Sequence, residues 1–388
     1  MTTPIIVSTG FEGGSAILTG IDGDHVRIRL RPDGDSPDFN WFYLRVSGVR
    51  GRDLKVSIEN ASDLSRLAGR EEVPDCWTGY RPFVSDDLAN WRRSDASYSD
   101  GTFTMFPQPV GDTVWIAYYP PFPMARHDAM IARAVNDPRC RLETLTTTPD
   151  GNDIDLLRIG TSGEGKPKAW IIGRQHPSET MAGFFAEGLL KRLLDPADGL
   201  GRHLCETLDI FVVPTVNPDG CLRGNTRMNA RGMNLNRAWR ETDPETAPEV
   251  AALRERMRAE GVDFCLDAHG DEELPYIFLG GPLEIPSRSD RLARLFRDFA
   301  TALGKATPAY SLSDPYPGGP PAEADMRMAW NSIAEEFDCL SILLEMPFKD
   351  CHRDPDPDMG WSPDRCARLG ASMLDAIEAV RPKLRPAG

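Results

Sequence analysis

The sequence predicts two regions of different fold class: an antiparallel β-sandwich over residues 1–120, then an α/β domain with a mixed, mostly parallel sheet over residues 121–388. Two observations predict this division. In the first region, short runs of alternating apolar and polar residues are separated by Gly, Pro, Asp or Asn, which is typical of half-buried strands. In the second region, stretches that are apolar throughout alternate with amphipathic stretches, which is typical of buried strands covered by helices.

The first region contains no convincing helical pattern, so we expect its strands to form an antiparallel sandwich. None of these strands carries a combination of residues typical of a catalytic site, and we expect a structural or recognition role for the domain. The expected strands are residues 25–32, 41–48, 53–60, 101–108 and 112–119.

The sequence PPFP at residues 120–123 separates the two regions, and MARHDAMIARAV directly after it has a helical pattern. Beyond that helix we expect five buried strands and four amphipathic helices. The expected strands are DIDLLRIG, PKAWIIG, LDIFVVPTV, VDFCLDAHG and CLSILLEMPF, and the expected helices are TMAGFFAEGLLKRLL, APEVAALRERMRA, SDRLARLFRDFATALG and CARLGASMLDAIEAV.

Composition limits the classes of partner and compartment. The formal net charge of −15 disfavours nucleic acid, because phosphate binding needs clustered Lys and Arg. No apolar run approaches the roughly 20 residues that span a bilayer, and the N-terminus lacks the basic and apolar segments of a secretory signal. The eight cysteines form no CxxC pair, which indicates reduced thiols. We therefore expect a cytoplasmic protein without a membrane partner; the sequence predicts no oligomeric state.

A histidine and a glutamate, His176 and Glu179, follow the apolar run KAWII. Ligands gather at the carboxyl ends of strands in such sheets. If a helix begins near Ser178, Glu179 lies in its first turn, at the same edge as His176. The pair fits half of a metal site, although a pair that only caps a helix has the same pattern. A second copy, His203 and Glu206, precedes the strand LDIFVVP and would lie at the wrong end of the sheet.

A third candidate ligand, His269, ends the apolar run VDFCLDAH at the edge where His176 is expected. An isolated histidine at a strand end is often an ordinary polar residue, but Asp267 is placed to orient this imidazole, as metal-bound histidines usually require. Catalytic zinc typically takes three protein ligands, and two His with one Glu are a known set in hydrolases. We therefore expect one Zn²⁺ per chain.

Glu345 ends the run LSILLE, in which every preceding residue is apolar or small. A carboxylate is costly to bury in such a strand, which favours a functional role, although it would also be tolerated if it reached solvent at the strand end. A glutamate near zinc can accept a proton from a water whose pKa the metal has lowered to about 7.

A loop rich in arginine follows the strand IFVVPTV, starting with a turn at Asn217-Pro-Asp-Gly. Guanidinium groups suit a carboxylate or a polarised carbonyl. Alternatively, the arginines of this loop only balance the negative charge of the protein surface. Recognition of nucleic acid is disfavoured because the loop has no interleaved aromatic residues. The arginines are Arg223, Arg227, Arg231 and Arg237.

Taken in order, these motifs resemble those of the zinc metallocarboxypeptidases: His-x-x-Glu, Asn-Pro-Asp-Gly, Gly-Asn-x-Arg, Asn-Leu-Asn-Arg, Asp-x-His-Gly and a late Glu before Pro-Phe. Within that family the chain looks like the cytosolic carboxypeptidase branch in its bacterial form, because WTGYRPFVSDD and GDTVWIAYYPPFP are similar to signatures of that branch. The resemblance covers nearly the whole chain and implies a β-sandwich before the catalytic domain.

The resemblance implies hydrolysis of the C-terminal residue of peptides or proteins. It also implies a role for each matching residue. His176, Glu179 and His269 match the zinc ligands, Glu345 the general acid/base, Arg227 the residue that polarises the scissile carbonyl and steadies the oxyanion, and Asn236 and Arg237 the pair that binds the terminal carboxylate of the substrate.

The chain departs from the digestive carboxypeptidases at two points. Ser178 stands where those enzymes have an arginine, and no motif identifies which tyrosine, Tyr310 or Tyr316, matches their mobile tyrosine. Because eukaryotic members of the cytosolic branch trim glutamates, acidic tails are one candidate substrate, with Arg327 as a candidate pocket residue.

Two alternatives stay open. A zinc amidohydrolase acting on small N-acyl amino acids or γ-glutamyl peptides would use the same ligands, although aspartoacylase-like relatives lack the N-terminal sandwich. A catalytically inactive peptide-binding protein is the other alternative, and the presence of all three ligands with Glu345 and Arg227 counts against it.

Overall fold

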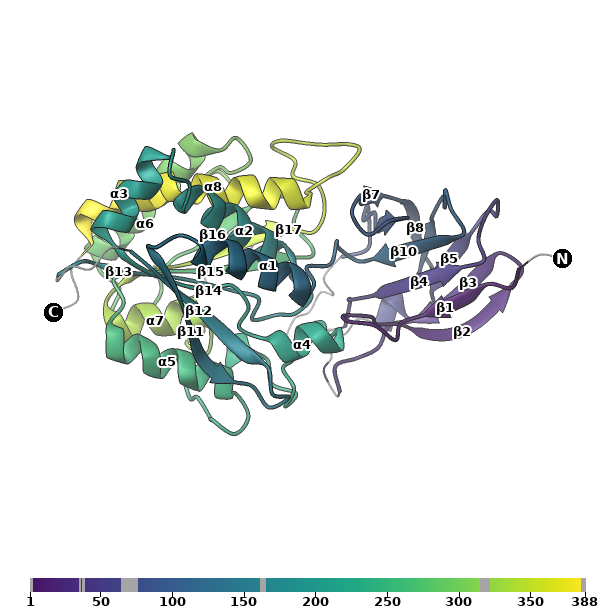
Figure 1. Ribbon diagram of the computed structural model, residues 1–388, viewed down its shortest axis with the longest axis horizontal. Coiled ribbons are helices and arrows are strands. Elements are labelled where there is room, and N and C mark those ends of the chain that lie inside the picture. The colour runs from purple at the N-terminus through teal and green to yellow at the C-terminus, as the bar shows by residue number, and fades with distance from the viewer. Residues whose placement is uncertain are drawn as a thin grey trace.

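The computed structural model describes residues 3–34, 36, 39–63, 76–160, 165–314 and 322–384. Its N-terminal part, residues 6–117, consists of two five-stranded sheets (Figure 1). One sheet has the order β1 (Ile6–Ser8), β4 (Tyr43–Ser47), β10 (Thr113–Ala117), β6 (Phe83–Ser85) and β7 (Arg92–Arg93). The other has the order β2 (Ile17–Asp22), β3 (His25–Arg29), β5 (Lys55–Ile58), β9 (Thr102–Phe106) and β8 (Asp95–Ser99).

The alternating pattern of these strands places their apolar side chains in one core. In β3, Val26 and Ile28 are buried while Arg29 is exposed, and β9 buries Phe103 and Met105 in the same way. The predicted sandwich is confirmed, including all five predicted strands. Among the described strands of the two N-terminal sheets, only β3 and β5 pair in parallel. The pattern missed β1, β2, β6, β7 and β8, which are short or largely exposed.

The second part contains a seven-stranded mixed sheet whose four central strands, β14, β13, β15 and β17, are parallel. Antiparallel strands lie on both sides of them. In sheet order the strands are β11 (Cys140–Thr147), β12 (Asp153–Ile159), β14 (Asp209–Val213), β13 (Lys168–Gly173), β15 (Phe264–Asp271), β17 (Leu340–Pro347) and β16 (Phe278–Gly280).

Helices cover both faces of this sheet, which explains why its central strands are apolar throughout (Figure 1). Adjacent strand residues belong to opposite faces: Trp170 packs in the cluster that includes α5 and α7, and Ile171 packs in the cluster that includes α2, α6 and α8. The helices are α1 (Met124–Val135), α2 (Met181–Leu193), α3 (Gly199–Thr207), α4 (Pro218–Arg223), α5 (Pro248–Glu260), α6 (Asp290–Ala306), α7 (Ala329–Phe337) and α8 (Pro363–Val380).

Two local expectations were wrong. The helix expected near Ser178 begins at Met181, because the backbone from His176 to Thr180 first forms tight turns, so Glu179 precedes the helix. The turn expected at Asn217 instead starts α4, since the Asn217 side chain caps this short helix by accepting a hydrogen bond from Gly220 N at 3.0 Å.

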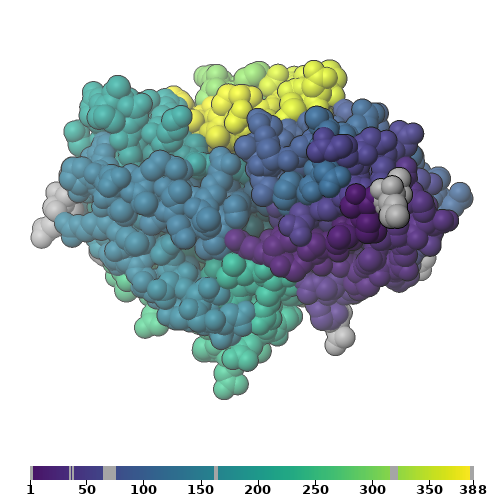
Figure 2. Space-filling model, turned by 45° about the vertical axis from the view of Figure 1, so that its right-hand side comes forward, coloured from purple at the N-terminus to yellow at the C-terminus, as the bar shows by residue number. Residues whose placement is uncertain are grey.

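The two parts pack directly against each other, as Figure 2 shows for one face of the molecule. Arg93 of β7 donates to the carbonyl oxygens of Phe348, just after β17, and of Met359. The ring of Phe348 lies 4.9 Å from that of Tyr118. One continuous apolar cluster therefore extends through both parts of the chain.

All eight cysteines lie in the described part of the chain and are buried and free, as the absence of a CxxC pair suggested. No helix in the described ranges is long and apolar enough to cross a membrane.

Candidate metal centre and active site

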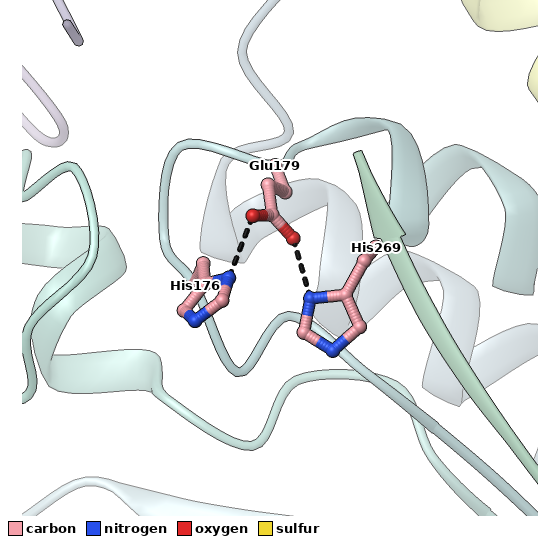
Figure 3. Close-up of side chains that lie close together, drawn as sticks. All are labelled: His176, Glu179 and His269. Carbon is pink, nitrogen blue, oxygen red and sulfur yellow. Dashed lines mark hydrogen bonds and ion pairs between the residues drawn. The ribbon is translucent and has the colours of Figure 1, made fainter. Parts of the chain in front are cut away.

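Three side chains converge at the carboxyl edge of the seven-stranded sheet: His176, Glu179 and His269 (Figure 3). His176 Nδ1 lies 2.6 Å from Glu179 Oε1, and His269 Nδ1 lies 2.7 Å from Glu179 Oε2. All three are buried, and their candidate ligand atoms lie within 4.8 Å of one another. Over the described ranges this is the one group of three or more His, Cys, Asp or Glu residues with that geometry.

The sheet topology brings these residues together. His176 follows the carboxyl end of β13, and His269 lies near the end of β15, its parallel neighbour. Glu179 reaches between them from the turn before α2, where its backbone N–H donates to the carbonyl of His176 at 3.3 Å. Its Oε2 also accepts a hydrogen bond from Gly270 N at 3.2 Å, which holds the carboxylate against β15.

Each histidine is oriented through its other ring nitrogen. His269 Nε2 lies 2.9 Å from Asp267 Oδ2, and His176 Nε2 lies 3.0 Å from Asn234 Oδ1. Gln175 Nε2 donates to the same Asp267 oxygen at 2.8 Å. With Nε2 paired to oxygen acceptors, both Nδ1 atoms are directed at Glu179, which is the arrangement of metal-binding imidazoles held by outer hydrogen bonds.

The charges of the cluster favour a cation. Burial lowers the pKa of His176 to about 4, so its imidazole is neutral at physiological pH. Burial alone would raise the pKa of Glu179, but the two histidines outweigh it and hold that pKa well below its usual value. Burial would lower the pKa of His269, yet Asp267 and Glu179 raise it well above its usual value. Two nitrogens and one carboxylate in such surroundings fit the donor set of zinc.

Glu345 lies directly beside this cluster, because in the parallel pairing of β15 with β17 it is the register partner of His269. Its Oε2 is buried and has no hydrogen-bond partner among the described residues. Burial raises the pKa of Glu345 well above its usual value. A desolvated carboxyl group without a fixed partner is suited to exchange protons with a bound molecule.

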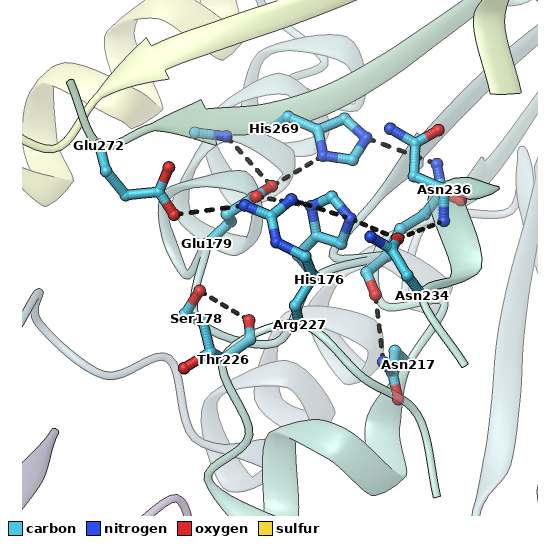
Figure 4. Close-up of polar contacts among 12 residues, drawn as sticks. His176, Ser178, Glu179, Asn217, Thr226, Arg227, Asn234, Asn236, His269 and Glu272 are labelled. Carbon is cyan, nitrogen blue, oxygen red and sulfur yellow. Dashed lines mark hydrogen bonds and ion pairs between the residues drawn. The ribbon is translucent and has the colours of Figure 1, made fainter. Parts of the chain in front are cut away.

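Arg227 lies against the ring of His176 (Figure 4). Its Nη1 is 3.3 Å from Nδ1 and 3.4 Å from Nε2 of that ring, and its Nη2 is 3.6 Å from Oε1 of Glu272. Burial raises the pKa of Glu272 to about 7, and Arg227 opposes the rise. Of the arginines singled out in the loop, Arg227 is the one whose guanidinium reaches the cluster; Arg223 instead pairs with Asp150 at 2.6 Å.

Asn236 and Arg237 lie in a short 3-10 turn (Leu235–Arg237) of the segment between α4 and α5. Asn236 Oδ1 accepts a hydrogen bond from Ala329 N at 2.9 Å, which fixes the amide at the start of α7. Arg237 is one-third exposed, and its Nε lies 3.8 Å from Asp325 Oδ2. Arg327 binds the same Asp325 at 2.7 Å and is more exposed.

The remaining candidates lie elsewhere or have structural contacts. Ser178 Oγ donates to Thr226 O at 2.8 Å. His203 in α3 is 44% exposed and pairs with Glu378, away from the cluster. Tyr310 is buried and pairs through its backbone with Ile277. Tyr316 lies outside the described residues.

Several residues of the site were missed by the sequence analysis. Gln175 directly precedes His176, and Asn234 is the first residue of the recognised Asn-Leu-Asn-Arg motif, although neither was given a role. Glu272 lies three residues after His269 in an acidic stretch that resembles ordinary surface. Asp33 and Asn40 carry no such signal, because they approach the site from the N-terminal part of the chain.

Comparison with known proteins adds an independent finding. Residues 7–119 match the family model of the cytosolic carboxypeptidase N-terminal domain, and residues 128–348 match that of zinc carboxypeptidase. An uncharacterized protein of Zymomonas mobilis is 37% identical over 98% of both chains. Cytosolic carboxypeptidase 2 of Danio rerio is 28% identical over 62% of this chain, which spans only 37% of that protein.

Two solved structures have a similar fold over nearly the whole length of this chain. A metallo-carboxypeptidase from Burkholderia cenocepacia has a TM-score of 0.92 and 35% identity, covering 98% of this chain and 100% of its own. A metallo-carboxypeptidase from Pseudomonas aeruginosa, solved in complex with (2-guanidinoethylmercapto)succinic acid, has a TM-score of 0.91 and 34% identity, with the same coverage.

Proposed function

Because the chain belongs to the zinc carboxypeptidase family, whose members are peptide hydrolases, we propose that it removes the C-terminal residue of peptides or proteins at one zinc site formed by His176, Glu179 and His269. One observation carries this proposal: two imidazole Nδ1 atoms and one buried carboxylate point at a common centre, while the outer nitrogens are paired with oxygen acceptors. When bound there, zinc supplies a Lewis acid that polarises a carbonyl oxygen and acidifies water.

Two residues beside the metal centre carry out the other steps of the proposed reaction: Glu345 transfers protons and Arg227 stabilises the oxyanion. Glu345 takes a proton from the attacking water and returns it to the leaving amine, since its buried Oε2 has no hydrogen-bond partner among the described residues. Its pKa falls when a cation lies nearby, which makes it a base at neutral pH. Arg227 donates hydrogen bonds to the oxyanion of the tetrahedral intermediate.

Asn236 and Arg237 bind the terminal carboxylate, which restricts cleavage to a chain end. Arg237 is the partly exposed member of the pair; its Nε lies 3.8 Å from Asp325 Oδ2, and its Nη1 donates to the carbonyl of Asn236 at 2.8 Å. For a substrate to reach Arg237, its carboxylate must compete with that acid. A bidentate pairing of guanidinium with the substrate carboxylate would favour the exchange.

The side chain preferred at the C-terminus is a finer part of the proposal. We propose acidic residues such as glutamate as a candidate class, supported by the likeness to cytosolic carboxypeptidases and by the basic pair Arg237 and Arg327. Asp325 partly neutralises both arginines, so the preference is a matter for direct assay. We also propose that residues 1–120 and 121–388 form two domains and that the protein acts in the cytoplasm, where its free cysteines stay reduced.

A peptide assay tests the function. The enzyme should release one residue from peptides with a free C-terminus and should leave the C-terminally amidated forms intact. Arg237→Ala should raise KM for free-acid substrates more than it lowers kcat. Peptides ending in Glu, Lys or Leu would measure the preference. Equal cleavage of free and amidated peptides would contradict the carboxypeptidase and favour an amidase or endopeptidase.

A further inference from the structure

The loop that carries Arg227 is held by a carboxylate from the N-terminal part of the chain. The backbone N–H groups of Thr226, Arg227 and Met228 all donate to Asp33, at 3.0, 2.7 and 3.0 Å. Asp33 is only 6% exposed and lies 193 residues before Thr226. Nearby, Arg31 donates to the carbonyl oxygens of Arg223 and Gly224, so the same N-terminal segment follows the loop over several residues.

Thr226 links this segment to the metal-binding turn. Its Oγ1 accepts hydrogen bonds from the backbone N–H groups of Asn40, at 3.2 Å, and Trp41, at 3.1 Å. Its carbonyl accepts from both N and Oγ of Ser178, which directly precedes Glu179 (Figure 4). The N-terminal part therefore contacts the loop of Arg227, and the loop in turn contacts the turn that carries Glu179.

Asn40 completes a second connection. Its Nδ2 donates to Glu272 Oε1 at 3.0 Å, and Glu272 is the carboxylate that lies beside the Arg227 guanidinium. The backbone of Arg227 is thus held by Asp33, while the acid beside its side chain is held by Asn40. Both contacts come from residues 33–40.

These contacts have a physical consequence for the position of Arg227. Residues 225–227 have neither helical nor strand hydrogen bonding, so no regular element places the loop. Buried backbone N–H groups need an acceptor, and a carboxylate that accepts three of them forms strong, directional bonds. Because a misplacement of about 1 Å at a catalytic group can cost about 100-fold in rate, such a clamp affects chemistry as well as stability.

We propose that Asp33 is a positioning residue that holds Arg227 in its catalytic place, so that the N-terminal sheets complete the active site. The inference rests on the proposed function insofar as Arg227 is taken to stabilise the oxyanion. It assigns to Asp33, and to Asn40 beside Glu272, an indirect role in the reaction of the other part of the chain.

Kinetics of the full-length, zinc-loaded enzyme test the proposal. Asp33→Ala should lower kcat by about 10- to 100-fold with little change in KM or zinc content. Asp33→Asn, which keeps the shape and one acceptor oxygen, should lose less. In an Arg227→Ala background, Asp33→Ala should cause no further loss, because it acts through that guanidinium. Independent, multiplicative losses in the double variant would overturn the proposal.

Glu12→Ala is the matched control. Glu12 is also an acid of the N-terminal part, and its Oε1 accepts a backbone hydrogen bond from Met124 at 2.5 Å, in the other part of the chain and away from residues 226–228 in the sequence. It should leave kcat near that of the wild type. If Glu12→Ala and Asp33→Ala lowered kcat equally, general adhesion between the two parts would explain both, and the specific role of Asp33 would be refuted.

Amide hydrogen exchange separates this inference from the proposed function. Residues 226–228 should exchange slowly in the wild type and at least about 10-fold faster in Asp33→Ala, while β13 and β15 stay protected. If no carboxypeptidase activity were found but this change occurred, the proposed function would fail and the clamp would stand. Unchanged exchange in folded Asp33→Ala would refute the clamp, whatever the activity.

Discussion

The histidines of this chain differ in the contacts that their two ring nitrogens make. His176 and His269 present Nδ1 to Glu179 and pair Nε2 with oxygen acceptors, whereas His203 is exposed beside Glu378. We expect His176→Ala and His269→Ala each to lose most of the bound zinc, because a catalytic site needs all three protein ligands. His203→Ala should keep about one zinc per chain. Metal analysis of the purified proteins measures this, and full zinc in both ligand variants would contradict the site.

A substitution at Glu345 can separate an effect on turnover from an effect on the fold or on zinc binding. Glu345→Gln preserves the shape of the side chain but removes its basicity, so zinc content and fold should be unchanged. Turnover should fall by about 10²–10⁴-fold, the usual contribution of a general base, and towards the upper end because the proposed mechanism uses this residue both as base and as acid. Steady-state kinetics with zinc measured on the same sample would decide. Near-normal turnover would mean that another residue activates the water.

Glu272 predicts a pH dependence of stability. Burial raises its pKa from 4.5 to about 7, so the folded state holds the proton more tightly than the unfolded state. Its stabilising contribution is therefore complete below about pH 4.5 and is lost as the pH rises through about 7. Glu272→Gln removes this loss. Relative to the wild type, the variant should gain about 1–3 kcal/mol in free energy of unfolding between pH 4.5 and 8.

Urea unfolding of metal-free wild type and Glu272→Gln at pH 4.5 and pH 8 measures this difference. The linear dependence of the unfolding free energy on urea allows the two proteins to be compared at each pH. An identical pH dependence in both proteins would show that Glu272 ionises as freely in the folded state as in the unfolded one.

At the scale of elements, α2 and α8 cross so closely that glycine is needed at their contact. A Cβ added at Gly188 would overlap the Ala367 carbonyl oxygen, and one added at Gly370 would overlap that of Phe185. Because backbone cannot yield as a side chain does, Gly188→Ala should destabilise the protein by about 1–3 kcal/mol or more. Gly199→Ala is the control, since its added Cβ meets nothing closer than 3.8 Å.

Thermal unfolding of the two glycine variants would test this packing. Gly188→Ala should lower Tm by several degrees, while Gly199→Ala should stay close to the wild type. If both variants had the Tm of the wild type, α2 and α8 would be able to move apart with little loss of stability, and their close packing would not be rigid.

Pairing of elements also explains which helices and strands were predictable. The central strands are apolar throughout, and α1, α2, α5, α6 and α8 lie in stretches predicted to be helical; the structure confirms these elements. The strand β11 was missed because it lies at the sheet edge with mostly exposed side chains. The short helices α4 and α7 were missed because six and nine residues contain too few turns to show a period.

At the scale of the whole molecule, Arg93 joins the N-terminal sheets to the end of β17. It donates to Phe348 O at 2.8 Å and to Met359 O at 3.0 Å, and its guanidinium lies 3.8 Å from the centre of the Phe83 ring. Arg93→Ala should lower the free energy of unfolding by about 2–4 kcal/mol, because it leaves several buried carbonyl groups without a donor.

Arg92→Ala is the control for this prediction. Its side chain is 38% exposed, and its guanidinium pairs with Asp86 at 3.2 Å. Exposed pairs of this kind contribute little, so the loss should stay below about 1 kcal/mol. Denaturant unfolding of both variants measures the difference. A similar small effect in both would show that the contact between the two parts adds little stability.

The sequence by itself determined the fold class and indicated His176, Glu179 and His269 as candidate metal ligands, which the structure brings together. Period and composition are local properties, so strands, helices and the compact motif at His176 could be recognised without coordinates. Asp267 was expected beside His269 because only one residue separates them, and the structure places it 2.9 Å from His269 Nε2.

Only the tertiary structure decided which distant residues hold that site in place. Glu345 lies beside His269 because of the register between β15 and β17, and Asp33 holds the Arg227 loop across 194 residues of chain. Such contacts depend on strand order and on the packing of the two parts, and they leave no local pattern because any buried acid would suit the backbone groups it binds. The candidate ligands and Asp267 were therefore predictable from the sequence, while the contacts of Gln175, Asn234 and Asp33 became evident only in the folded chain.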